Sequence, residues 1–528
     1  MNSARIIYHL ARADFLERVR RYSFLVMLGL VVFLGYQTAI GNLALELGQY
    51  RGEFNSAWVG AMMSLIGTFF IGWFGFYMVK GPVARDRETG VGQIMATTPL
   101  TRPLYLLGKW LSNFLVLMAM VAILALAGIV IQLLQGENTQ INLLVFLEPF
   151  FFIVMPLMAL VAATAVLFET IPFLQGGFGN IIYFFAFIMF VPLFMENNAL
   201  KNYPAFEPMG LGLLASEMGK AVTAVHPDYN GDFTLGGGVT GGATTTFIWN
   251  GIHWTSEFVF ARFSLIVIAL VLTFLGALFF DRFDPSRTKP RKMKGGASIS
   301  EPTPASTSQA LPTPHLTPLT SSPLGNKSAN RFSFFTVLTA ELKLLLKGQR
   351  WWWYAVAGGL IIASVVNSPA ITREIVLPIA WVWPILIWSA IGNREIHHNV
   401  QQLTFSSASP VWRQVPAQWL AGFIVTLLMA SGAVLRFGID GDTIGLIALL
   451  SGALFIPSLA LAAGVWSGTS KLFEILYMVI WYLGPLNKLT ALDYIGSHSD
   501  GSPQFFIPFS LVLIVLAFWG RSRQLRTV

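Results

Sequence analysis

The chain has 528 residues, of which 55% are hydrophobic and only 11% are charged, with a formal charge of +8 and no cysteine. A soluble domain of ordinary composition has about 25% charged residues, so this composition excludes a wholly soluble enzyme. The lack of cysteine excludes disulfides, thiolate metal sites and cysteine nucleophiles.

Twelve apolar runs, each bounded by charged or turn residues, are candidate membrane spans. A lipid core of about 30 Å requires about 20 residues of helix. We therefore expect an all-α polytopic membrane protein with about twelve transmembrane helices. The seventh and eleventh runs are short, so ten or eleven spans also fit the sequence. The runs cover residues 22–41, 57–79, 106–134, 144–168, 178–195, 259–281, 351–367, 374–392, 416–437, 443–466, 472–486 and 505–520.

Lysine and arginine are concentrated in alternate segments of this topology. With the N-terminus inside, the inner segments include five Arg before residue 22 and six basic residues between 282 and 294. Segments rich in Lys and Arg stay in the cytoplasm. We therefore expect a multi-pass protein of the cell (inner) membrane with both termini cytoplasmic. The basic charge reflects topology, so the expected partner is membrane lipid and not nucleic acid.

Two stretches outside the spans differ from the rest. Residues 4–21 place apolar side chains such as Ile7 and Leu10 among five Arg, which is typical of a helix on the cytoplasmic membrane face. An ordinary charged start to the first span fits the same residues. Residues 285–331 contain eight Pro among Ser, Thr, Gly and Ala, and their apolar periodicity vanishes. This composition predicts a flexible cytoplasmic linker.

The linker divides the chain into two parts of similar layout, 1–284 (with an external loop at 196–258) and 332–528. Each part begins with a charged amphipathic stretch, 4–21 or 333–350, and continues with two spans and a long inner segment. Gln93-Ile94 and Trp110-Leu111 match Gln402-Leu403 and Trp419-Leu420. Matching Arg87-Glu88 with Arg394-Glu395 then requires two extra residues after Glu395. Since both parts begin inside, we expect a parallel 6+6 pseudo-dimer.

The inner segment after the second run, residues 80–103, is longer than a plain connection requires. Pro82 ends the span, four alternating charges follow at Arg85 to Glu88, and a short apolar stretch lies between Gly90 and Pro99. Dense charge followed by a compact apolar helix suits docking into a groove of a cytoplasmic partner. A solvated charged loop is the alternative interpretation.

The run Arg85-Asp86-Arg87-Glu88-Thr89-Gly90, ending in Thr98-Pro99-Leu100-Thr101-Arg102, resembles the cytoplasmic segment of ABC-2-type permeases, the membrane subunits of ABC exporters. The stretches 247–255 and 280–285 are also similar to that family, and the likeness covers essentially residues 1–290. The second part departs from it, because His397-His398-Asn399 replace the Thr-Gly stretch.

The resemblance implies a permease driven by separate ATP-binding cassette subunits, either two copies or a pair, which bind ATP and Mg. It also implies that the segment after the second span is a coupling helix seated on the ATPase. The contacts implied for the first part are Arg85, Asp86, Arg87, Glu88, Thr89, Gly90 and Gln93, and those for the second are Arg394, Glu395 and Gln402.

We expect no cofactor in this chain and no enzymatic activity of its own. The phosphate-binding pattern G-x-x-x-x-G-K-[ST] is absent, and its nearest fragment, Gly219-Lys220-Ala221, lacks the hydroxyl residue and the first Gly. The external His226, Asp228, Asp232, His253 and Glu257 show no convergent ligand spacing beyond His253 and Glu257 at i, i+4. A polar loop is therefore preferred to a metal site.

Glu148 is an ionisable residue inside the fourth run, next to Pro149. A carboxylate in the lipid core is costly, so it marks a candidate functional position. It could line a substrate path or brace a bent helix, and it could equally lie at the external interface.

Two functions from different classes remain. The first is the transmembrane subunit of an ATP-driven exporter with an unidentified, hydrophobic or amphipathic substrate. The second is a self-sufficient secondary transporter or channel, which predicts ionisable residues at the middle of the spans. Apart from Glu148 the spans are nearly free of charge, while the inner segments are elaborate, and this balance favours the exporter.

Overall fold

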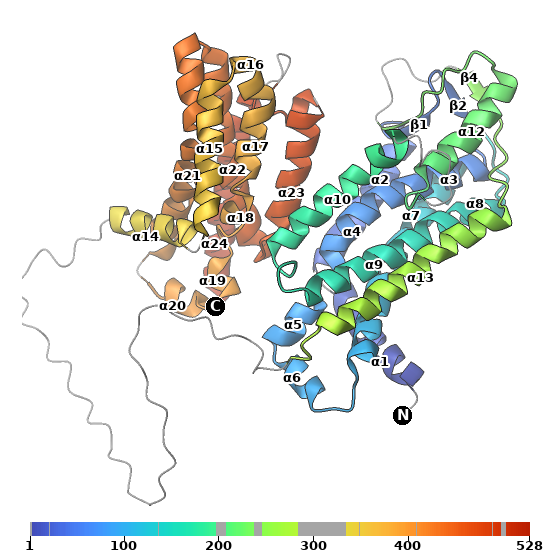
Figure 1. Cartoon of the computed structure of the whole chain (residues 1–528), viewed down its shortest axis with the longest axis horizontal. Coiled ribbons are helices and arrows are strands. Elements are labelled where there is room, and N and C mark those ends of the chain that lie inside the picture. Colours follow the sequence, from blue (N-terminus) through green and yellow to red (C-terminus); the bar gives the residue numbers. More distant parts are fainter. Residues whose placement is uncertain are drawn as a thin grey trace, which may run out of the picture.

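The computed structural model describes residues 3–20, 22–135, 137–196, 207–236, 245–283, 334–347, 349–407, 409–487, 489–497 and 503–527. The predicted linker, 285–331, lies outside these residues. Two helical bundles stand side by side, one from the first part of the chain and one from the second (Figure 1).

The first bundle is built from helices, three of them short, with π-helical turns η1 and η2 and four short strands. Its elements are α1 (Ser3–Val19), α2 (Tyr22–Ala39), β1 (Ala44–Glu46), β2 (Tyr50–Gly52), α3 (Ser56–Ile66), η1 (Gly67–Ile71), α4 (Gly72–Val79), α5 (Pro82–Glu88), α6 (Val91–Ala96), α7 (Arg102–Gln135), α8 (Leu143–Pro149), η2 (Phe150–Val154), α9 (Met155–Thr170), α10 (Gly177–Glu196), α12 (Leu211–Val225), β3 (Thr234–Gly236), β4 (Thr245–Phe247) and α13 (Ser256–Phe279).

In its described residues the second bundle consists of helices and the turns that connect them, without a strand. Its elements are α14 (Phe334–Leu346), α15 (Trp351–Val366), α16 (Pro369–Ile371), η5 (Thr372–Val376), α17 (Leu377–Val382), α18 (Ile385–Trp388), α19 (Arg394–His397), α20 (Gln401–Phe405), α21 (Pro410–Asp440), α22 (Thr443–Ser467), α23 (Lys471–Trp481), η6 (Tyr482–Leu486), η7 (Thr490–Leu492), η8 (Pro503–Phe505) and α24 (Phe506–Thr527).

The long helices begin and end at residues suited to those positions. The Asn55 side chain accepts from Trp58 N at the start of α3, and Asn142 accepts from Val145 N at the start of α8. Gly441 ends α21 with φ 69°, a left-handed conformation that glycine adopts without strain. The π turns η1 and η2 continue their helices without a break, so the predicted runs 57–79 and 144–168 each form one helical unit.

Every predicted apolar run is largely helical, although the run 374–392 is broken at 383–384 and ends as helix at Trp388. The prediction of an all-α polytopic membrane protein is confirmed. Among the described residues, seven helices are long and apolar enough to cross a membrane, and three apolar helices are shorter. Two of the shorter helices, Gly177–Met189 and Trp351–Val366, match the predicted fifth and seventh spans. The count of twelve spans stays a prediction.

The elements are sorted between two ends of the bundles. At the lower end in Figure 1 lie α1, α5, α6, α19 and α20, and α24 also ends there. At the upper end of the first bundle lie α12 and two small sheets, in which β1 pairs antiparallel with β3 and β2 pairs parallel with β4. The segments predicted to lie on one side of the membrane thus share one end of the molecule.

Contacts between distant segments tie together the upper end of the first bundle. We call this part, formed by α12 and the strands β1 to β4, the upper lobe. The Arg51 guanidinium bonds Glu137 at 2.5 and 3.0 Å, and Glu137 also accepts from Phe54 N at 2.8 Å. The Tyr50 hydroxyl donates to Asp228 at 2.5 Å, and this hydrogen bond holds the pKa of the Asp228 carboxyl below its ordinary value. The Arg51 bridge also lowers the pKa of Glu137. These bonds join the α2–α3 connection to residues far along the chain.

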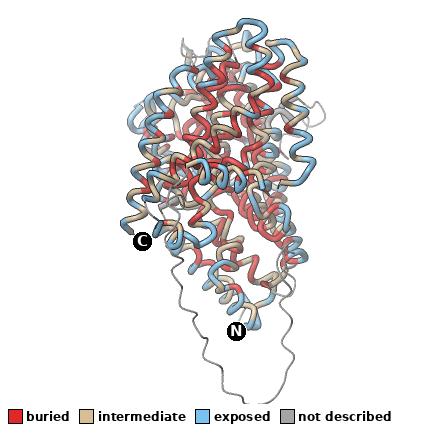
Figure 2. Tube along the Cα trace, turned by 90° about the vertical axis from the view of Figure 1, so that its left-hand side faces the viewer, coloured by how far each residue is buried: buried red, intermediate tan, exposed pale blue. Residues whose placement is uncertain are grey.

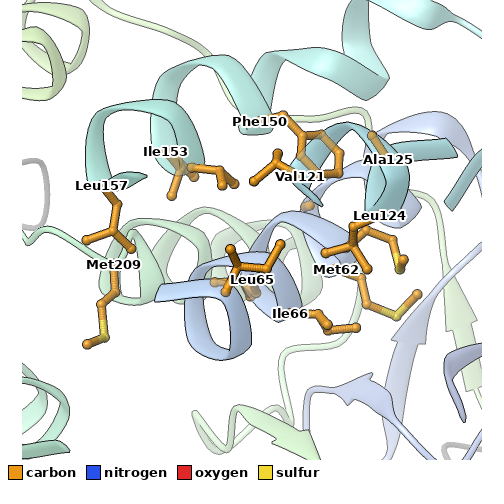
Figure 3. Close-up of a cluster of buried hydrophobic side chains, with 14 of the residues drawn as sticks. Met62, Leu65, Ile66, Val121, Leu124, Ala125, Phe150, Ile153, Leu157 and Met209 are labelled. Atoms are coloured by element: carbon orange, nitrogen blue, oxygen red, sulfur yellow. The ribbon is translucent and has the colours of Figure 1, made fainter. Parts of the chain in front are cut away.

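Each bundle has its own apolar core. Figure 2 shows buried residues running through the interior of the molecule, with exposed positions on its flanks and ends. In the first bundle, α3 contributes Met62 and Leu65, α7 contributes Leu124, and η2 contributes Phe150 and Ile153 (Figure 3). The exposed flanks are themselves apolar, for example Val267 and Leu278 on α13, as expected of surfaces that face lipid.

The bundles meet where α10 packs against α23 (Figure 1). Phe184 of α10 lies in the core of the second bundle, and Trp73 of α4 packs against the cores of both. The Tyr482 ring stands edge-on to Trp73, with the ring centroids 6.3 Å apart. We call this contact between α10, α4 and α23 the seam.

Candidate functional site

The first segment, α5 with α6, leaves the bundle in a direction fixed by backbone contacts. Gly81, with φ 131°, turns the chain out of α4, and Pro82 occupies the first position of α5. The Glu169 carboxylate of α9 accepts from the backbone N–H of Gly81 at 2.6 Å and of Val83 at 2.7 Å. A carboxylate suits the N-terminus of a helix because the free N–H groups there carry partial positive charge. Gly90, with φ 75°, separates α5 from α6.

A buried network of charges joins this segment to α1 and α7. Lys109 of α7 is fully buried, and its Nζ lies 2.6 Å from both Asp14 Oδ2 and Asp86 Oδ2. Arg85 bridges the same two acids at 3.0 and 3.2 Å, and the Tyr105 hydroxyl donates to Asp86 at 2.8 Å. Arg85 also pairs with the partly exposed Glu17 of α1, so two cations hold the two buried acids and a third acid at the surface. The network holds α5 rigidly on the bundle.

The N-terminal helix provides one half of this network through the face it buries. The stretch predicted to be helical over 4–21 forms α1, which packs on α7. Its buried residues are Ala11, Asp14 and Arg18, and Arg18 donates to Asn113 at 2.5 Å. The face on α7 therefore buries charged side chains, flanked by half-buried apolar residues such as Leu10 and Phe15, while Tyr8 and Leu16 are exposed.

A second ion pair fixes the far end of the first segment. The Arg87 guanidinium lies 3.0 Å from both carboxylate oxygens of Asp281, just beyond α13. Gly92 of α6 lies against the Phe283 ring so closely that an added Cβ would come within 2.6 Å of it. The first segment is therefore held at both ends by its own bundle.

The predicted contact residues of the first segment divide into two groups. Arg85, Asp86 and Arg87 pair within the chain, and Asp86 is only 2% exposed. Glu88, Thr89 and Gln93 are exposed, together with Ile94, which is 68% exposed. Gly90 is half-buried between the two helices. The first group supports the segment, and the second forms its outer surface.

The second segment, α19 with α20, is supported in the same manner. Arg394 pairs with Glu341 of α14 at 2.9 Å. The buried Glu395 accepts from Gln418 at 2.5 Å and from Arg521 at 3.3 Å. Burial raises the pKa of Glu341, against the opposing effect of Arg394. The segment is thus fastened to α14, α21 and α24 of its own bundle.

The outer surface of the second segment also carries an aliphatic side chain. Gln402 is exposed, and Leu403 beside it is 77% exposed. His397 and His398, which replace the Thr-Gly stretch, are exposed as well, with ring centroids 5.0 Å apart. The two segments therefore present the same Gln–aliphatic pair with different neighbouring charge.

Equivalent contacts in the two segments lie a constant distance apart in the sequence. Lys109 bonds Asp86, as Gln418 bonds Glu395, and each residue of the second pair follows its counterpart by 309 positions. The same spacing relates Trp110, which donates to Ala159 O at 3.0 Å, to Trp419, which donates to Ser458 Oγ at 2.9 Å.

These contacts correct the predicted alignment. Arg394-Glu395 corresponds to Arg85-Asp86, not to Arg87-Glu88, and no extra residues are required. Asn399, with φ 53°, then stands at the position of Gly90, with φ 75°. Asn tolerates the left-handed conformation better than most residues, so the turn between the two short helices is kept without glycine.

Glu148 lies on α8 and is half-buried. Trp254 Nε1, in the stretch before α13, donates to its carboxylate at 3.0 Å. The contact joins α8 to that stretch. A place for Glu148 in a substrate path stays a prediction.

Sequence reasoning missed the internal partners of the segments. In the sequence, Lys109 is only one of the basic residues near the end of a predicted span. Asp14 and Glu341 lie in the stretches 4–21 and 333–350, which were interpreted from their apolar residues. An i, i+4 pair of opposite charges in α1, Asp14 and Arg18, was the available signal for a buried polar face. Among the described residues, no group of three His, Cys, Asp or Glu could hold a metal ion.

The fold and the segments define a class, a polytopic helical membrane protein that displays two supported surface helices at one end. Residues 8–230 match the family model of the ABC-2 family transporter proteins, and this match supports an ABC-2-type permease. No curated protein and no solved structure matches the chain. The matched residues lie in the first bundle, and the fusion of two equivalent halves stays a prediction. The protein is a membrane component for transport.

Proposed function

We propose that this chain is the transmembrane subunit of an ATP-driven exporter, working with separate ATP-binding subunits that dock on the first and second segments. One observation carries the proposal. Two short helices at the same end of the molecule, α6 and α20, each carry one strongly exposed aliphatic side chain, Ile94 or Leu403, while ion pairs fix the preceding helix, α5 or α19, to its bundle (Figure 1). A rigid support beneath an exposed apolar anchor suits transmission of force from a partner.

The repeat of contacts supports the proposal that both bundles are permease halves, with the linker passing between them. The repeat also supports a topology in which both segments and both termini lie in the cytoplasm and the spans lie in the inner membrane. Since the aliphatic anchors are alike, two copies of one ATP-binding subunit fit both sites. ATP and Mg would be bound by these subunits, and the substrate would be a hydrophobic or amphipathic molecule.

The rival function, a self-sufficient secondary transporter, is less well supported by the placement of buried charge. Lys109 lies in the second turn of α7, Glu169 lies one residue before the end of α9, and Glu474 lies in the first turn of α23. Buried ionisable groups that relay ions are expected near the middle of spans. These groups lie near helix ends, where they fasten segments together.

A pair of charge reversals tests the proposal. In membranes where the chain is made together with candidate ATP-binding subunits, Glu88→Lys should weaken co-purification and stimulated ATP hydrolysis. Glu53→Lys, at the upper end, is the matched control and should leave both unchanged. The proposal fails if Glu53→Lys damages association while Glu88→Lys, at normal membrane levels, leaves it intact.

A further inference from the structure

Buried polar side chains cross the seam between the bundles beside the first segment. Asn180 of α10 donates to Glu474 of α23 at 2.6 Å, and both side chains are buried. Lys80, the residue after α4, donates to Asn180 Oδ1 at 2.8 Å and to Leu174 O at 2.9 Å. From the second bundle, Lys471 Nζ donates to the carbonyl of Lys80 and, at 3.4 Å, to that of Tyr77.

We propose that Lys80, Asn180, Lys471 and Glu474 form a lock between the bundles and that through it the first segment, unlike the second, is tied to the opposite bundle. The inference rests on the proposed function for the meaning of the segments. Below, these four residues are called the seam lock.

The connection to the first segment is direct. The carbonyl that Lys471 holds belongs to Lys80, and the next two residues are Gly81 and Pro82, where α5 begins. On the other side of this turn, Glu169 fixes the backbone N–H groups of Gly81 and Val83. The turn into α5 is therefore held by both bundles, and α5 cannot tilt about it without loosening the contacts of Lys471.

Within the described residues, the charged contacts of the lock occur on one side of the seam and have no equivalent on the other. Tyr183 of α10 and Tyr477 of α23 make equivalent bonds, to Gly72 O at 2.6 Å and to Trp381 O at 2.8 Å. Tyr477 follows Tyr183 by 294 positions in the sequence. With the same spacing, Lys471 is the counterpart of Gly177, and Glu474 is the counterpart of Asn180. The two charged positions of α23 therefore correspond to uncharged positions of α10.

The counterpart of Lys80 confirms this asymmetry in charge. A spacing of 309 positions leads from Lys80 to Ser389, whose hydroxyl donates to Leu386 O within its own turn at 3.1 Å. The small residue at 177 also has a role, since an added Cβ there would come within 2.6 Å of Glu474 Oε1. The second segment is held by Glu341, Gln418 and Arg521, all from its own bundle.

The consequence is unequal coupling. A partner that moves the first segment pulls directly on α23. Among the described residues, the ion pair and hydrogen bonds that hold the second segment lead to its own bundle. Opening of the seam at its lower end is thus controlled from the first segment, although both segments can bind equivalent partners.

The test uses the chain as it exists, since the absence of cysteine allows two labels to be placed without background. Spin labels at Phe178→Cys on α10 and Leu476→Cys on α23, both exposed positions, report the separation of the helices in the purified full chain. Lys471→Met and Glu474→Leu should lengthen and broaden the distance distribution. Lys471→Arg and Glu474→Gln, which keep a donor and an acceptor, should preserve it.

Two controls keep the result interpretable. Asp440→Asn removes an ion pair within α21, to Arg436, and should leave the distribution unchanged. A second label pair within the first bundle, at the exposed Thr97 and Thr223, shows that each variant remains folded if its distance is preserved. Unchanged seam distances in both Lys471→Met and Glu474→Leu would overturn the lock.

The asymmetry has its own measurement with the same labels. Glu169→Gln weakens the hold on the first segment and should broaden the seam distribution, whereas Gln418→Leu loosens the second segment and should not. Equal responses would overturn the one-sided coupling. Neither experiment contains an ATP-binding subunit, so failure of docking on the segments would leave both results standing.

Discussion

Lys109 offers the most demanding test of how the first segment is supported. Its ammonium group is fully buried and lies 2.6 Å from Asp14 and from Asp86, which are themselves 6% and 2% exposed. Lys109→Met keeps the length of the side chain and removes the charge. Two buried carboxylates then face each other, and Arg85, which pairs with both, is shared with Glu17. Removing one partner of a buried ion pair typically costs about 3–5 kcal/mol.

The cost should appear as a large fall in thermal stability. A domain of 150–250 residues loses roughly 2–4 °C of Tm per kcal/mol, so the variant should unfold roughly 6 °C or more below the parent. Tryptophan fluorescence of the purified chain at one fixed heating rate measures this, because heat unfolding of a membrane protein depends on scan rate. The double variant Lys109→Met with Asp86→Asn should recover part of the loss.

An exposed lysine provides the matched control. Lys220 pairs with Glu217 on the surface of α12, and such pairs contribute little. Lys220→Met should therefore unfold close to the parent temperature. If Lys109→Met also unfolds within about 1 °C of the parent, the buried network does not support the first segment as argued.

Three further predictions concern other parts of the chain. The Arg51 bridge lowers the pKa of Glu137 in the folded state, so the bridge stabilises the fold above the ordinary Glu pKa and this stabilisation is lost as the pH falls through the folded-state pKa. The Tm of the parent should therefore fall more than the Tm of Glu137→Gln between about pH 5 and pH 3. Equal falls in Tm would contradict this. Deleting a dozen residues within 290–325 should leave membrane assembly intact in gel filtration, because a tether gains little from its length; loss of assembly would show that the segment is recognised. The purified chain without partners should not hydrolyse ATP in a phosphate-release assay, since it has no phosphate-binding loop, and turnover by a sample free of other ATPases would refute this.

Much of the architecture follows from hydrophobic length alone. The predicted run 106–134 lies within α7, and 443–466 matches α22 to within a residue. Such runs are predictable because lipid requires both an apolar surface and internally bonded backbone. The strands of the upper lobe were not predicted, since they are short and pair residues nearly 200 positions apart. The helix α12, of 15 residues, was not predicted either and lies within the loop expected at 196–258.

The candidate segments could be located from the sequence, but the roles of their residues could not be separated. Arg87 and Glu88 are neighbours of opposite charge, and only the position of Asp281 shows that Arg87 faces inward while Glu88 is exposed. Pairing of Asp86 with Lys109 likewise requires α5 to pack on α7. The correct alignment of the two segments depends on those contacts, because charged dipeptides match at several registers.

The central claim, that partners seat on Ile94 and Leu403, is tested most directly by Ile94→Asp and Leu403→Asp in the full chain made with its ATP-binding subunits. Losing a central apolar anchor costs about 2 kcal/mol or more, roughly 30-fold in affinity. Each single variant should weaken co-purification, and the double variant should abolish it, while Val225→Asp, an exposed apolar residue of the upper lobe, leaves it unchanged. Normal recovery of the subunits with the double variant would contradict the account.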